Sequence, residues 1–322
     1  MLGFGIIGTN FISDWFVDAC RRAGCEPVAV YSRTQSTGDD FAGRRGIAHA
    51  VDSLDALLAL PGVDAVYVAS PNGAHLEQSL AAFAAGKHVL CEKTLGTSLD
   101  EATRIVETAR DQGLVVQEAV RPVHDPAYDL IRANLPRLGA LRSARFEKLQ
   151  YSSRYDRVKS GEHLNAFDPS LGNSSLADIG VYTLQPALDL FGAPARSAGA
   201  SVWLPNGFEA SGTILLAYDG FVATCDYSKI TSGIGPSVIV GEAGTLTIDS
   251  ISQPGVVTFH ERGGDVDVLL DEPDRPDWSN MHHEIAAFAG YVERGEFPER
   301  FAAVSLAARA LMDEQLARTP AS

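Results

Sequence analysis

The stretch that decides the fold is GFGIIGTNFIS, residues 3–13. Its first half is a short apolar run of the kind that forms a buried strand, and Gly8 then begins a turn. After the turn, Phe11 and Trp15 start an apolar pattern with helical spacing, which Gly24 ends. A strand, a tight turn and a helix in this order present backbone amides to an anion, because the first amides of a helix have no partner within it.

The turn departs from the usual glycine pattern of dinucleotide-binding proteins. In the G-x-G-x-x-G register the three positions are Gly8, Asn10 and Ser13, so one glycine remains. Asparagine tolerates left-handed backbone angles better than most residues, and serine is small. Pyrophosphate binding is therefore one interpretation, and a plain tight turn is the other. If a dinucleotide binds, the expected contacts are Gly8, Thr9, Asn10, Phe11 and Ile12.

Further strands follow, each apolar along most of its length. They are EPVAVY (26–31), VDAVYVA (63–69), KHVLCE (87–92) and LVVQEAV (114–120). Helical segments separate them, and one begins at a predicted capping box of Ser98 and Glu101. Apolar strands that alternate with helices form a parallel sheet covered on both faces. Residues 1–121 are therefore predicted to be an α/β Rossmann domain, a dinucleotide-binding domain with a doubly wound parallel sheet.

The rhythm changes from residue 122 onward. Strand-like segments joined by turn residues are ALRSARFEKLQY (140–151), ASGTILLAY (210–218), FVATCDYS (221–228), SVIVG (237–241), GTLTID (244–249) and VVTFHE (256–261). One helix is expected among them, around residues 175–191, and two more near the C-terminus. Residues 122–322 are therefore predicted to be an α+β domain with a mostly antiparallel sheet, for substrate binding and oligomerisation.

Composition limits the possible partners. The 322 residues are 45% hydrophobic and 21% charged, which is ordinary for a globular protein. Lysines and arginines number 26 against 41 acidic residues, a formal net charge of −15, so nucleic acid and anionic membranes are not expected as partners. The four cysteines show no zinc-like or CxxC spacing, and no signal peptide or apolar span of membrane length is apparent. A cytoplasmic protein with reduced thiols is the expectation.

The loop after the second strand bears on the choice of cofactor. It reads Ser32, Arg33 and Thr34, where a site that prefers NAD commonly places an acidic residue. A guanidinium makes paired, charge-assisted bonds to a 2′-phosphate, so NADP is favoured and NAD remains possible. The alternative is that Arg33 is a solvated surface arginine.

Two other loops follow strands at the same predicted edge of the sheet. The first places Ser70, Pro71, Asn72 and His75 there. The second places Glu92 and Lys93 there. Because ligands of such folds lie at the carboxyl ends of the strands, these six residues are candidate cofactor contacts. For Glu92 and Lys93 the alternative is a surface ion pair.

A second constellation lies in the segment LADIGVYTLQPALDLFG, residues 176–192. In a helix, Asp178 and Tyr182 would lie on one face, because they are four residues apart, with Gly180 between them allowing close approach. A tyrosine packed in the core with a satisfied hydroxyl is the alternative.

The motifs GIIGT (5–9), SPNGAH (70–75), GKHVLCEKT (86–94), EAVRP (118–122) and LGNSSLADIGVY (171–182) occur in that order. In this combination the chain resembles the glucose-fructose oxidoreductase and inositol dehydrogenase family (Gfo/Idh/MocA) over nearly its whole length. With tyrosine at the end of its DIGVY motif, the chain most resembles the branch of the family that contains dimeric dihydrodiol dehydrogenases and glucose-fructose oxidoreductase. The resemblance implies that Lys93 is the catalytic lysine, Tyr182 the acid/base residue and Asp178 a residue that orients the substrate or its partners. Thr94 stands where the family usually has proline.

The chemistry expected of such a site is hydride transfer. Oxidation of a secondary alcohol needs a base for the hydroxyl proton, and a lysine ammonium near a phenol favours the phenolate that can act as one. Lys93 and Tyr182 are therefore predicted to handle the proton together, on a sugar, polyol or cyclic diol. The alternative is a regulatory protein that binds NADP(H) without catalysis. A methyltransferase is a third reading, which gives no role to Ser32 and Arg33.

Remaining polar residues give weaker signals. Arg154, His163 and Asn165 precede the Asp178 segment and are candidate substrate contacts. His282 and His283 are adjacent, so on a helix they diverge by about 100° and do not form a metal-binding pair. No metal is expected. The strands of the second domain are rich in apolar residues, so a homodimer or homotetramer formed through its sheet is expected.

Overall fold

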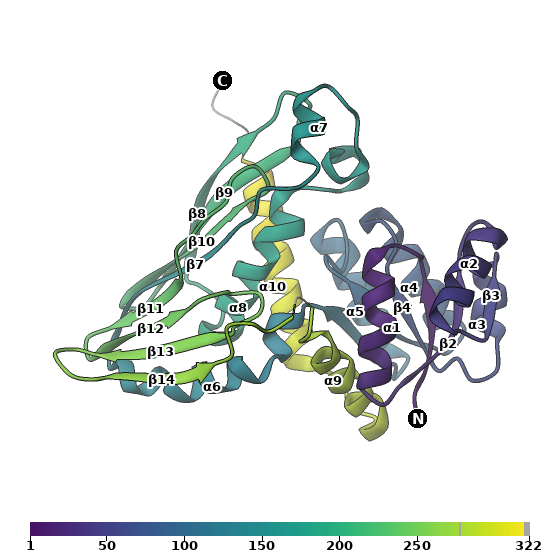
Figure 1. The fold of residues 1–322 in the computed structure, drawn as a ribbon, viewed down its shortest axis with the longest axis horizontal. Helices are drawn as coiled ribbons and strands as arrows, with labels where there is room; N and C mark the ends of the chain where they lie inside the picture. Colours follow the sequence, from purple (N-terminus) through teal and green to yellow (C-terminus); the bar gives the residue numbers. More distant parts are fainter. Residues whose placement is uncertain (277, 319–322) are drawn as a thin grey trace. The chain divides into compact units, whose positions relative to one another are not determined.

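The computed structural model of the protein describes residues 1–276 and 278–318 (Figure 1). The chain divides into two compact units. Unit 1 comprises Met1–Ala119 and Trp278–Leu306, and unit 2 comprises Val120–Asp277 and Ala307–Ser322. Each unit contains one sheet with its own helices.

Unit 1 contains a six-stranded parallel sheet. Its strands are β1 (Gly3–Ile7), β2 (Glu26–Tyr31), β3 (His49–Val51), β4 (Ala65–Val68), β5 (His88–Glu92) and β6 (Val116–Ala119), in the order β3-β2-β1-β4-β5-β6. All five pairings are parallel. The predicted Rossmann fold is confirmed. The order reverses between β1 and β4, and the crevice at this switch point is where ligands of such sheets bind.

Helices cover both faces of this sheet. They are α1 (Phe11–Arg22), α2 (Gln35–Arg45), α3 (Leu54–Ala59), α4 (His75–Ala84), α5 (Leu99–Asp111), α9 (Met281–Arg294) and the first part of α10 (Glu299–Leu316). One apolar cluster joins the sheet to α1, α2 and α9, and a second joins it to α3, α4, α5 and α10. Neither α2 nor β3 was predicted, because α2 is polar and buries only Gly38, Phe41 and Ala42.

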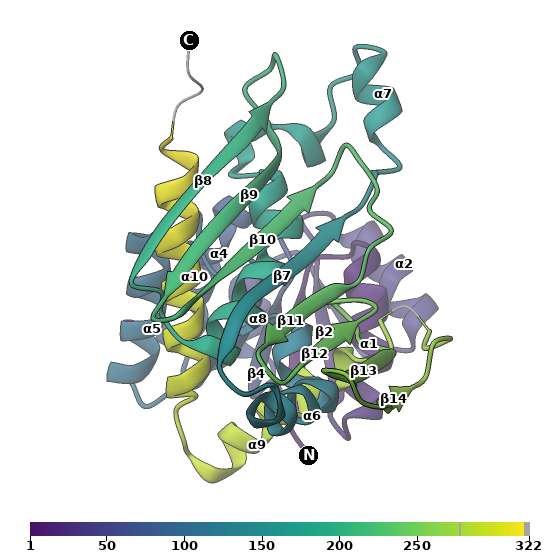
Figure 2. The same cartoon turned by 90° about the vertical axis from the view of Figure 1, so that its left-hand side faces the viewer.

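Unit 2 contains an eight-stranded sheet (Figure 2). Its strands are β7 (Leu141–Leu149), β8 (Arg196–Trp203), β9 (Glu209–Tyr218), β10 (Phe221–Ser228), β11 (Ser237–Gly241), β12 (Gly244–Ile248), β13 (Val256–Glu261) and β14 (Val266–Asp271). The order is β14-β13-β12-β11-β7-β10-β9-β8, and only β10 with β7 is parallel among these described strands. The predicted mostly antiparallel sheet is confirmed, with β8 and β14 added at its two edges.

The helices of unit 2 are more numerous than predicted. They are α6 (Pro126–Asn134), α7 (Tyr155–Lys159), α8 (Val181–Phe191) and the end of α10, with a π-helical turn, η6 (Leu176–Gly180), directly before α8. Short 3-10 turns are η1 (Asn72–Ala74) in unit 1 and η2 (Arg121–His124), η3 (Leu135–Leu138), η4 (Asn165–Phe167) and η5 (Pro169–Leu171) in unit 2. Because α8 packs against β7 and β10, it brings η6 to the strand ends of this sheet.

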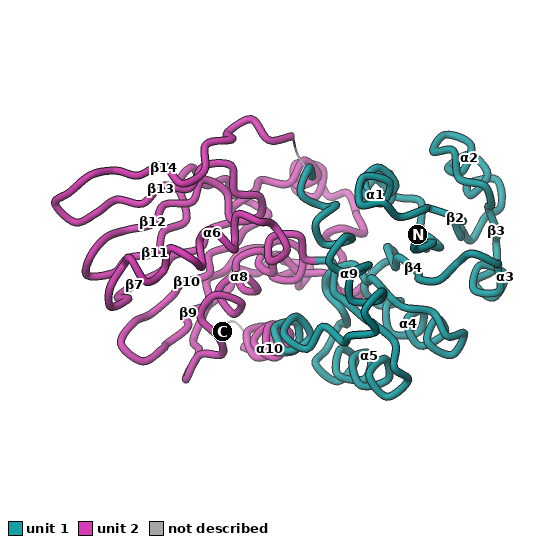
Figure 3. Tube along the Cα trace, turned by 90° about the horizontal axis from the view of Figure 1, so that it is seen from below, with its two compact units in different colours: residues 1–119, 278–306 teal, residues 120–277, 307–322 magenta. Residues whose placement is uncertain are grey.

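The units do not coincide with the ranges 1–121 and 122–322 expected from the sequence (Figure 3). The C-terminal helix α9 belongs to unit 1, because Met281, Ile285 and Phe288 are fully buried in the cluster that contains Phe4 and Phe16. The phenyl rings of Phe4 and Phe288 lie 5.7 Å apart. A helix from the end of the chain therefore completes the N-terminal core.

The four cysteines are buried and free. Within residues 1–276 and 278–318, no helix combines the length and the apolar character needed to cross a membrane.

Candidate active site

In the turn after β1, the backbone requires a glycine at position 8. This residue has φ +109°, and a Cβ built on it would lie 2.7 Å from the carbonyl oxygen of Ala69. Asn10 is extended, with φ −83° and ψ 177°, and not left-handed as its residue type suggested. Its side chain caps α1 instead: Oδ1 accepts from the amides of Ile12 (3.0 Å) and Ser13 (3.4 Å), and Nδ2 donates to Ala69 O (2.8 Å). The asparagine thus joins the helix to the end of β4.

The loop after β2 holds the residues predicted to choose the cofactor. The amide of Ser32 donates to the carbonyl oxygen of Val51 (3.1 Å), which fixes the start of the loop. Arg33 follows with an exposed side chain, and Thr34 occupies the N-cap position of α2 without a side-chain capping bond. A guanidinium is therefore carried at the carboxyl end of β2, beside the switch-point strand β1.

The loop after β4 is held by His75. Ser70 Oγ donates to Gln78 Oε1 (2.7 Å), Pro71 is exposed and Asn72 is half-buried. The ring of His75 is buried, with Nε2 3.0 Å from Ser70 O and Nδ1 2.8 Å from Thr94 O. Burial lowers the pKa of the imidazole. His75 was predicted as a cofactor contact, and its two ring nitrogens contact backbone carbonyls of two loops.

The loop after β5 carries Lys93. The peptide bond between Lys93 and Thr94 is cis, at the place where the family usually has proline. Thr94 Oγ1 donates to Gly96 O (3.0 Å), and the amide of Leu95 donates to the buried carboxylate Glu118 (2.9 Å). Together with the contact of His75, these bonds fix the loop on the C-terminal side of the half-buried lysine.

Glu92, the neighbour of Lys93, has a partner that the sequence did not indicate. Its carboxylate accepts a hydrogen bond from the hydroxyl of Tyr67 on β4, a ring that is buried and stacked on Phe16. The last residue of β5, directly before Lys93, is therefore tied to the neighbouring strand β4. Ser98 Oγ accepts from the amide of Glu101 (3.2 Å) as predicted, whereas the Glu101 carboxylate accepts from Thr97 and not from Ser98.

In unit 2, Asp178 and Tyr182 do not lie in one α-helix. Asp178 belongs to the π-helical turn η6, and Tyr182 lies in the first turn of α8. Gly180 between them packs closely on β10, since a Cβ there would lie 2.9 Å from Cγ of Tyr227. Tyr182 is buried, and the guanidinium of Arg121 lies 5.6 Å from the centre of its ring. A cation over a ring is attracted by its π electrons, so Arg121 helps to hold the phenol.

Two buried ionisable residues at the ends of strands hold η6, and neither was predicted from the sequence. Lys229, directly after β10, places Nζ 2.8 Å from Oδ2 of Asp178. Glu209 on β9 accepts a hydrogen bond at Oε2 from the amide of Leu176 (2.9 Å), the first residue of the turn. Burial raises the pKa of Glu209 to about 7. Both contacts join residues at least 33 positions apart, so no local motif could reveal them.

The predicted substrate contacts all lie in one exposed segment of unit 2. Arg154 is the N-cap residue of α7, and His163 Nε2 lies 3.3 Å from Asp168 Oδ2. The carbonyl oxygen of Asn165 accepts from Asn173 (2.8 Å). His282 and His283 start α9 with ring centres 3.9 Å apart, and no group of metal-ligating side chains was found among the described residues.

The predicted residues thus form two groups. The cofactor candidates gather at the carboxyl ends of β1, β2, β4 and β5 in unit 1. Asp178 and Tyr182 lie on consecutive turns in unit 2. The pairing of Lys93 with Tyr182 stays a prediction.

Comparison with known proteins gives matches along the chain. Residues 1–120 match the family model described as "Oxidoreductase family, NAD-binding Rossmann fold", and residues 135–247 match "GFO/IDH/MocA C-terminal domain". A scyllo-inositol 2-dehydrogenase (NADP(+)) of Bacillus subtilis (strain 168) is 38% identical over 297 residues, 92% of this chain and 90% of that protein. A trans-1,2-dihydrobenzene-1,2-diol dehydrogenase of Oryctolagus cuniculus is 29% identical over 78% of this chain and 74% of its own length.

Among solved structures, a 3-ketoreductase from Actinomadura kijaniata in complex with NADP and TDP-benzene superposes with a TM-score of 0.84 at 27% identity. The match covers 98% of this chain and 96% of that one. The motifs at the carboxyl ends of the strands indicate the same family as both family models and the relatives that match along most of the chain. The two sheets are consistent with that assignment. The chain therefore belongs to the Gfo/Idh/MocA family of NAD(P)-dependent oxidoreductases, and residues 1–120 are its NAD-binding Rossmann domain.

Proposed function

We propose that this chain is an NADP-preferring dehydrogenase or reductase that moves a hydride between nicotinamide and a secondary alcohol or ketone of a sugar, polyol or cyclic diol. The observation that carries the proposal is Lys93, held at the carboxyl end of β5 in a loop fixed by buried hydrogen bonds. A doubly wound sheet holds its dinucleotide at this edge. Relatives named scyllo-inositol 2-dehydrogenase (NADP(+)) and D-xylose 1-dehydrogenase (NADP(+)) 2 support the reaction class.

The residues of unit 1 fit a dinucleotide. The backbone leaves β1 at Gly8, where a Cβ would collide with Ala69 O, and α1 begins three residues later, so its first amides lie at the carboxyl end of β1. The backbone of Thr9 to Ile12 is assigned to the pyrophosphate, and Arg33, with Ser32 and Thr34, to the 2′-phosphate of the ribose. Ser70, Pro71 and Asn72 border the same crevice from β4. When bound, the dinucleotide supplies the hydride acceptor or donor.

The proton is assigned to Lys93 and Tyr182. In oxidation, the Tyr182 phenolate takes the proton of the substrate hydroxyl. The Lys93 ammonium stabilises the phenolate and binds the oxygen of that substrate hydroxyl. In reduction, Tyr182 gives the proton back and Lys93 polarises the carbonyl. Asp178 accepts a hydrogen bond from a neighbouring hydroxyl, and Arg154, His163 and Asn165 are assigned to the rest of the sugar. Solved structures of the 3-ketoreductase include a lysine-to-alanine variant and a tyrosine-to-phenylalanine variant, which are changes at the same two residue types.

Steady-state kinetics of Lys93→Met and Tyr182→Phe test the assignment. The substrate panel contains scyllo-inositol, D-xylose and trans-1,2-dihydrobenzene-1,2-diol, after which three relatives are named. Loss of a positioned acid or base is expected to lower kcat/KM by about 100- to 10,000-fold. Lys87→Met and Tyr218→Phe are matched controls, because Lys87 donates to Val63 O and Tyr218 to Gly192 O, and none of these residues is assigned to the site.

Two outcomes would contradict this proposal. Activity within tenfold of wild type in both variants would remove Lys93 and Tyr182 from the reaction. A wild-type protein that binds NADPH tightly and turns over no member of a broad sugar and diketone panel would instead be a non-catalytic NADP(H)-binding regulatory protein.

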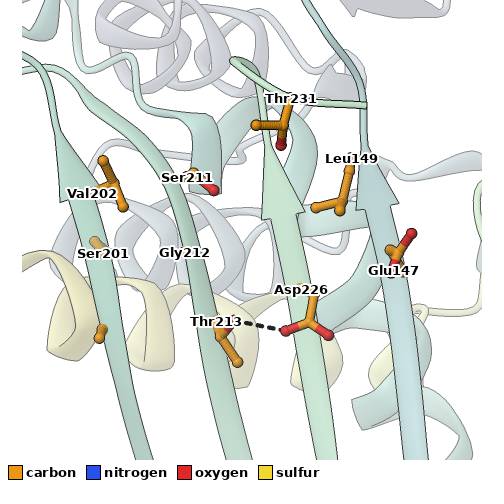
Figure 4. A pocket seen from close by; sticks show the side chains of 10 residues that line it. Glu147, Leu149, Ser201, Val202, Ser211, Gly212, Thr213, Asp226 and Thr231 are labelled. Carbon is orange, nitrogen blue, oxygen red and sulfur yellow. Dashed lines mark hydrogen bonds between the residues drawn. The ribbon is translucent and has the colours of Figure 1, made fainter. Parts of the chain in front are cut away.

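We also propose that the chain forms a homodimer, or a homotetramer, through the open face of its eight-stranded sheet. Val202 on β8, Leu215 on β9 and Val222 on β10 are 55%, 37% and 43% exposed on this face, and in β9 and β10 such residues alternate with buried ones. A groove of about 420 Å³ crosses the same face, and Thr213 donates to Asp226 within it (Figure 4). An exposed apolar sheet face of this kind is commonly covered by another chain.

A further inference from the structure

Lys229 is a buried lysine behind the turn that carries Asp178. It directly follows β10, and only 5% of the residue is exposed. Its backbone is fixed on both sides, since its amide donates to Ala210 O (3.0 Å) and its carbonyl oxygen accepts from the amide of Ser152 (2.9 Å). Burying an ammonium group is unfavourable unless charged and polar partners replace the water that it loses.

The surroundings of the ammonium group provide such partners. Nζ lies 2.8 Å from Oδ2 of Asp178 and donates to the carbonyl oxygen of Ala166 (3.0 Å). The rings of Phe167 and Phe208 lie 4.7 and 5.5 Å from it, and both rings are buried. A carboxylate, a carbonyl and two aromatic faces together fix Nζ in one position.

The ion pair is asymmetric in its exposure. The side chain of Lys229 is 7% exposed and that of Asp178 is 44% exposed. A polar molecule that arrives from solvent therefore meets the carboxylate, whereas the ammonium lies behind it. Lys229 can act on such a molecule only through Asp178.

We propose that Lys229 is a positioning residue of the reaction: it keeps Asp178 ionised and oriented, and so sets the affinity of the site for hydroxyl groups of the substrate. This inference rests on the proposed function, because the hydroxyls that Asp178 holds belong to that substrate. A carboxylate can accept hydrogen bonds from two vicinal hydroxyls at once, and these bonds are strongest when it is charged and held in one orientation. The ammonium supplies both conditions.

The kinetic test uses Lys229→Gln and Lys229→Met. The glutamine keeps a hydrogen-bond donor for Asp178 and Ala166 without the charge, so it is the variant expected to fold most readily. For both we expect KM for the polyol to rise about tenfold to a hundredfold, with kcat changed less. The acidic limb of the pH profile of kcat/KM is expected to move to higher pH, because an opposite charge favours the ionised carboxylate. A role confined to stability would leave that limb in place.

Lys159→Met is the matched control. Lys159 also pairs with an aspartate, Asp156, at 2.6 Å, but the two side chains are 52% and 73% exposed. KM and the pH profile of this variant are expected to match wild type. A double-mutant cycle of Lys229→Gln with Asp178→Asn adds a second readout. If Lys229 acts through Asp178, the glutamine should raise KM less than threefold further in the asparagine background.

Carbon-13 NMR of the aspartate carboxyls tests the role of Lys229 by a measurement that does not depend on enzyme activity. Asp178→Asn assigns the resonance, and its titration midpoint is expected to rise by about 1 to 3 pH units in Lys229→Gln. An unchanged midpoint, or an active wild type whose KM and acidic limb are unaffected by both Lys229 variants, would overturn the inference and leave the proposed function standing. A wild type without turnover would overturn the proposed function, and the carboxyl titration would still decide the role of Lys229.

Discussion

His75, at the start of α4, contacts Thr94 in the loop after β5: Nδ1 of the buried imidazole lies 2.8 Å from the Thr94 carbonyl oxygen. Its other ring nitrogen lies 3.0 Å from Ser70 O, so one side chain joins the loops after β4 and β5. The lysine proposed for catalysis directly precedes Thr94. The position of Lys93 therefore depends on a histidine that lies beneath the loop.

Replacing His75 with leucine should weaken both stability and catalysis. A neutral imidazole has one N–H, so one buried carbonyl loses its donor at a cost of about 1 to 3 kcal/mol, and the free energy of unfolding should fall by at least that amount. Urea denaturation measures the loss, and kcat should fall while the Kd for NADPH changes little. His49→Leu, at an exposed position of β3, is the control. A stable, fully active His75→Leu protein would show that the loop does not need the imidazole.

Glu209 should make the stability of the protein depend on pH. Burial raises the pKa of its carboxyl from 4.5 to about 7 in the folded state, so between these values the folded protein holds a proton that the unfolded chain has released. The stabilisation is complete below pH 4.5 and is lost as pH rises to about 7, at about 1.4 kcal/mol per pH unit.

Glu209→Gln removes this titration while keeping an acceptor for the Leu176 amide. The variant should equal wild type in unfolding free energy near pH 4.5 and exceed it by up to about 3 kcal/mol at pH 8. Denaturation at several pH values measures the difference, and Glu261→Gln, an exposed glutamate of β13, should show none. A difference that stays constant with pH would contradict the prediction.

Arg33→Ala tests the preference for NADP. A charge-assisted pair between a guanidinium and a phosphate is worth about 1.5 to 3 kcal/mol, so the Kd for NADPH should rise about tenfold to a hundredfold. Binding of NADH, which lacks the 2′-phosphate, should stay within threefold. Fluorescence titration of both dinucleotides gives the ratio. Arg44→Ala on α2, whose guanidinium pairs with Asp40, should leave the ratio unchanged. Equal losses for both dinucleotides would argue against recognition of the 2′-phosphate.

Leu215→Lys and Val222→Lys should separate the proposed oligomer. Each places an ammonium on the open sheet face, which cannot be buried without a partner charge. Light scattering is expected to give about 69 kDa or more for wild type, at least twice the 34.3 kDa of one chain, and one chain for the variants. Ile234→Lys, at a fully exposed position between β10 and β11, is the control. A wild-type mass of one chain would exclude this assembly.

Helices and strands with periodic apolar residues were predicted correctly, because the spacing of buried side chains along the sequence differs between a helix and a strand. Every strand predicted in the first 120 residues is present, and so are α1, α3, α4 and α5. Short or polar elements escaped: β3 has three residues, and α7 has five residues without a buried side chain. Their presence depends on what packs around them.

Local motifs in the sequence indicate the candidate site residues, whereas the long-range contacts around them leave no local signal. Lys93, Asp178 and Tyr182 stand in recognisable stretches, whereas Lys229 reaches Asp178 from 51 positions away and Glu209 reaches Leu176 from 33. The π-helical turn was read as α-helix because the four-residue spacing is common to both. Its close packing through Gly180 on Tyr227 is visible only in three dimensions.

The return of α9 to unit 1 has a practical consequence for anyone who dissects this protein. A fragment that stops at residue 120 would lack Met281, Ile285 and Phe288, and would leave Phe4 and Phe16 without the helix that shields them from water. Such a fragment is expected to aggregate. The core of the nucleotide-binding unit therefore closes only after the strands of the eight-stranded sheet, which precede α9 in the sequence, have been synthesised.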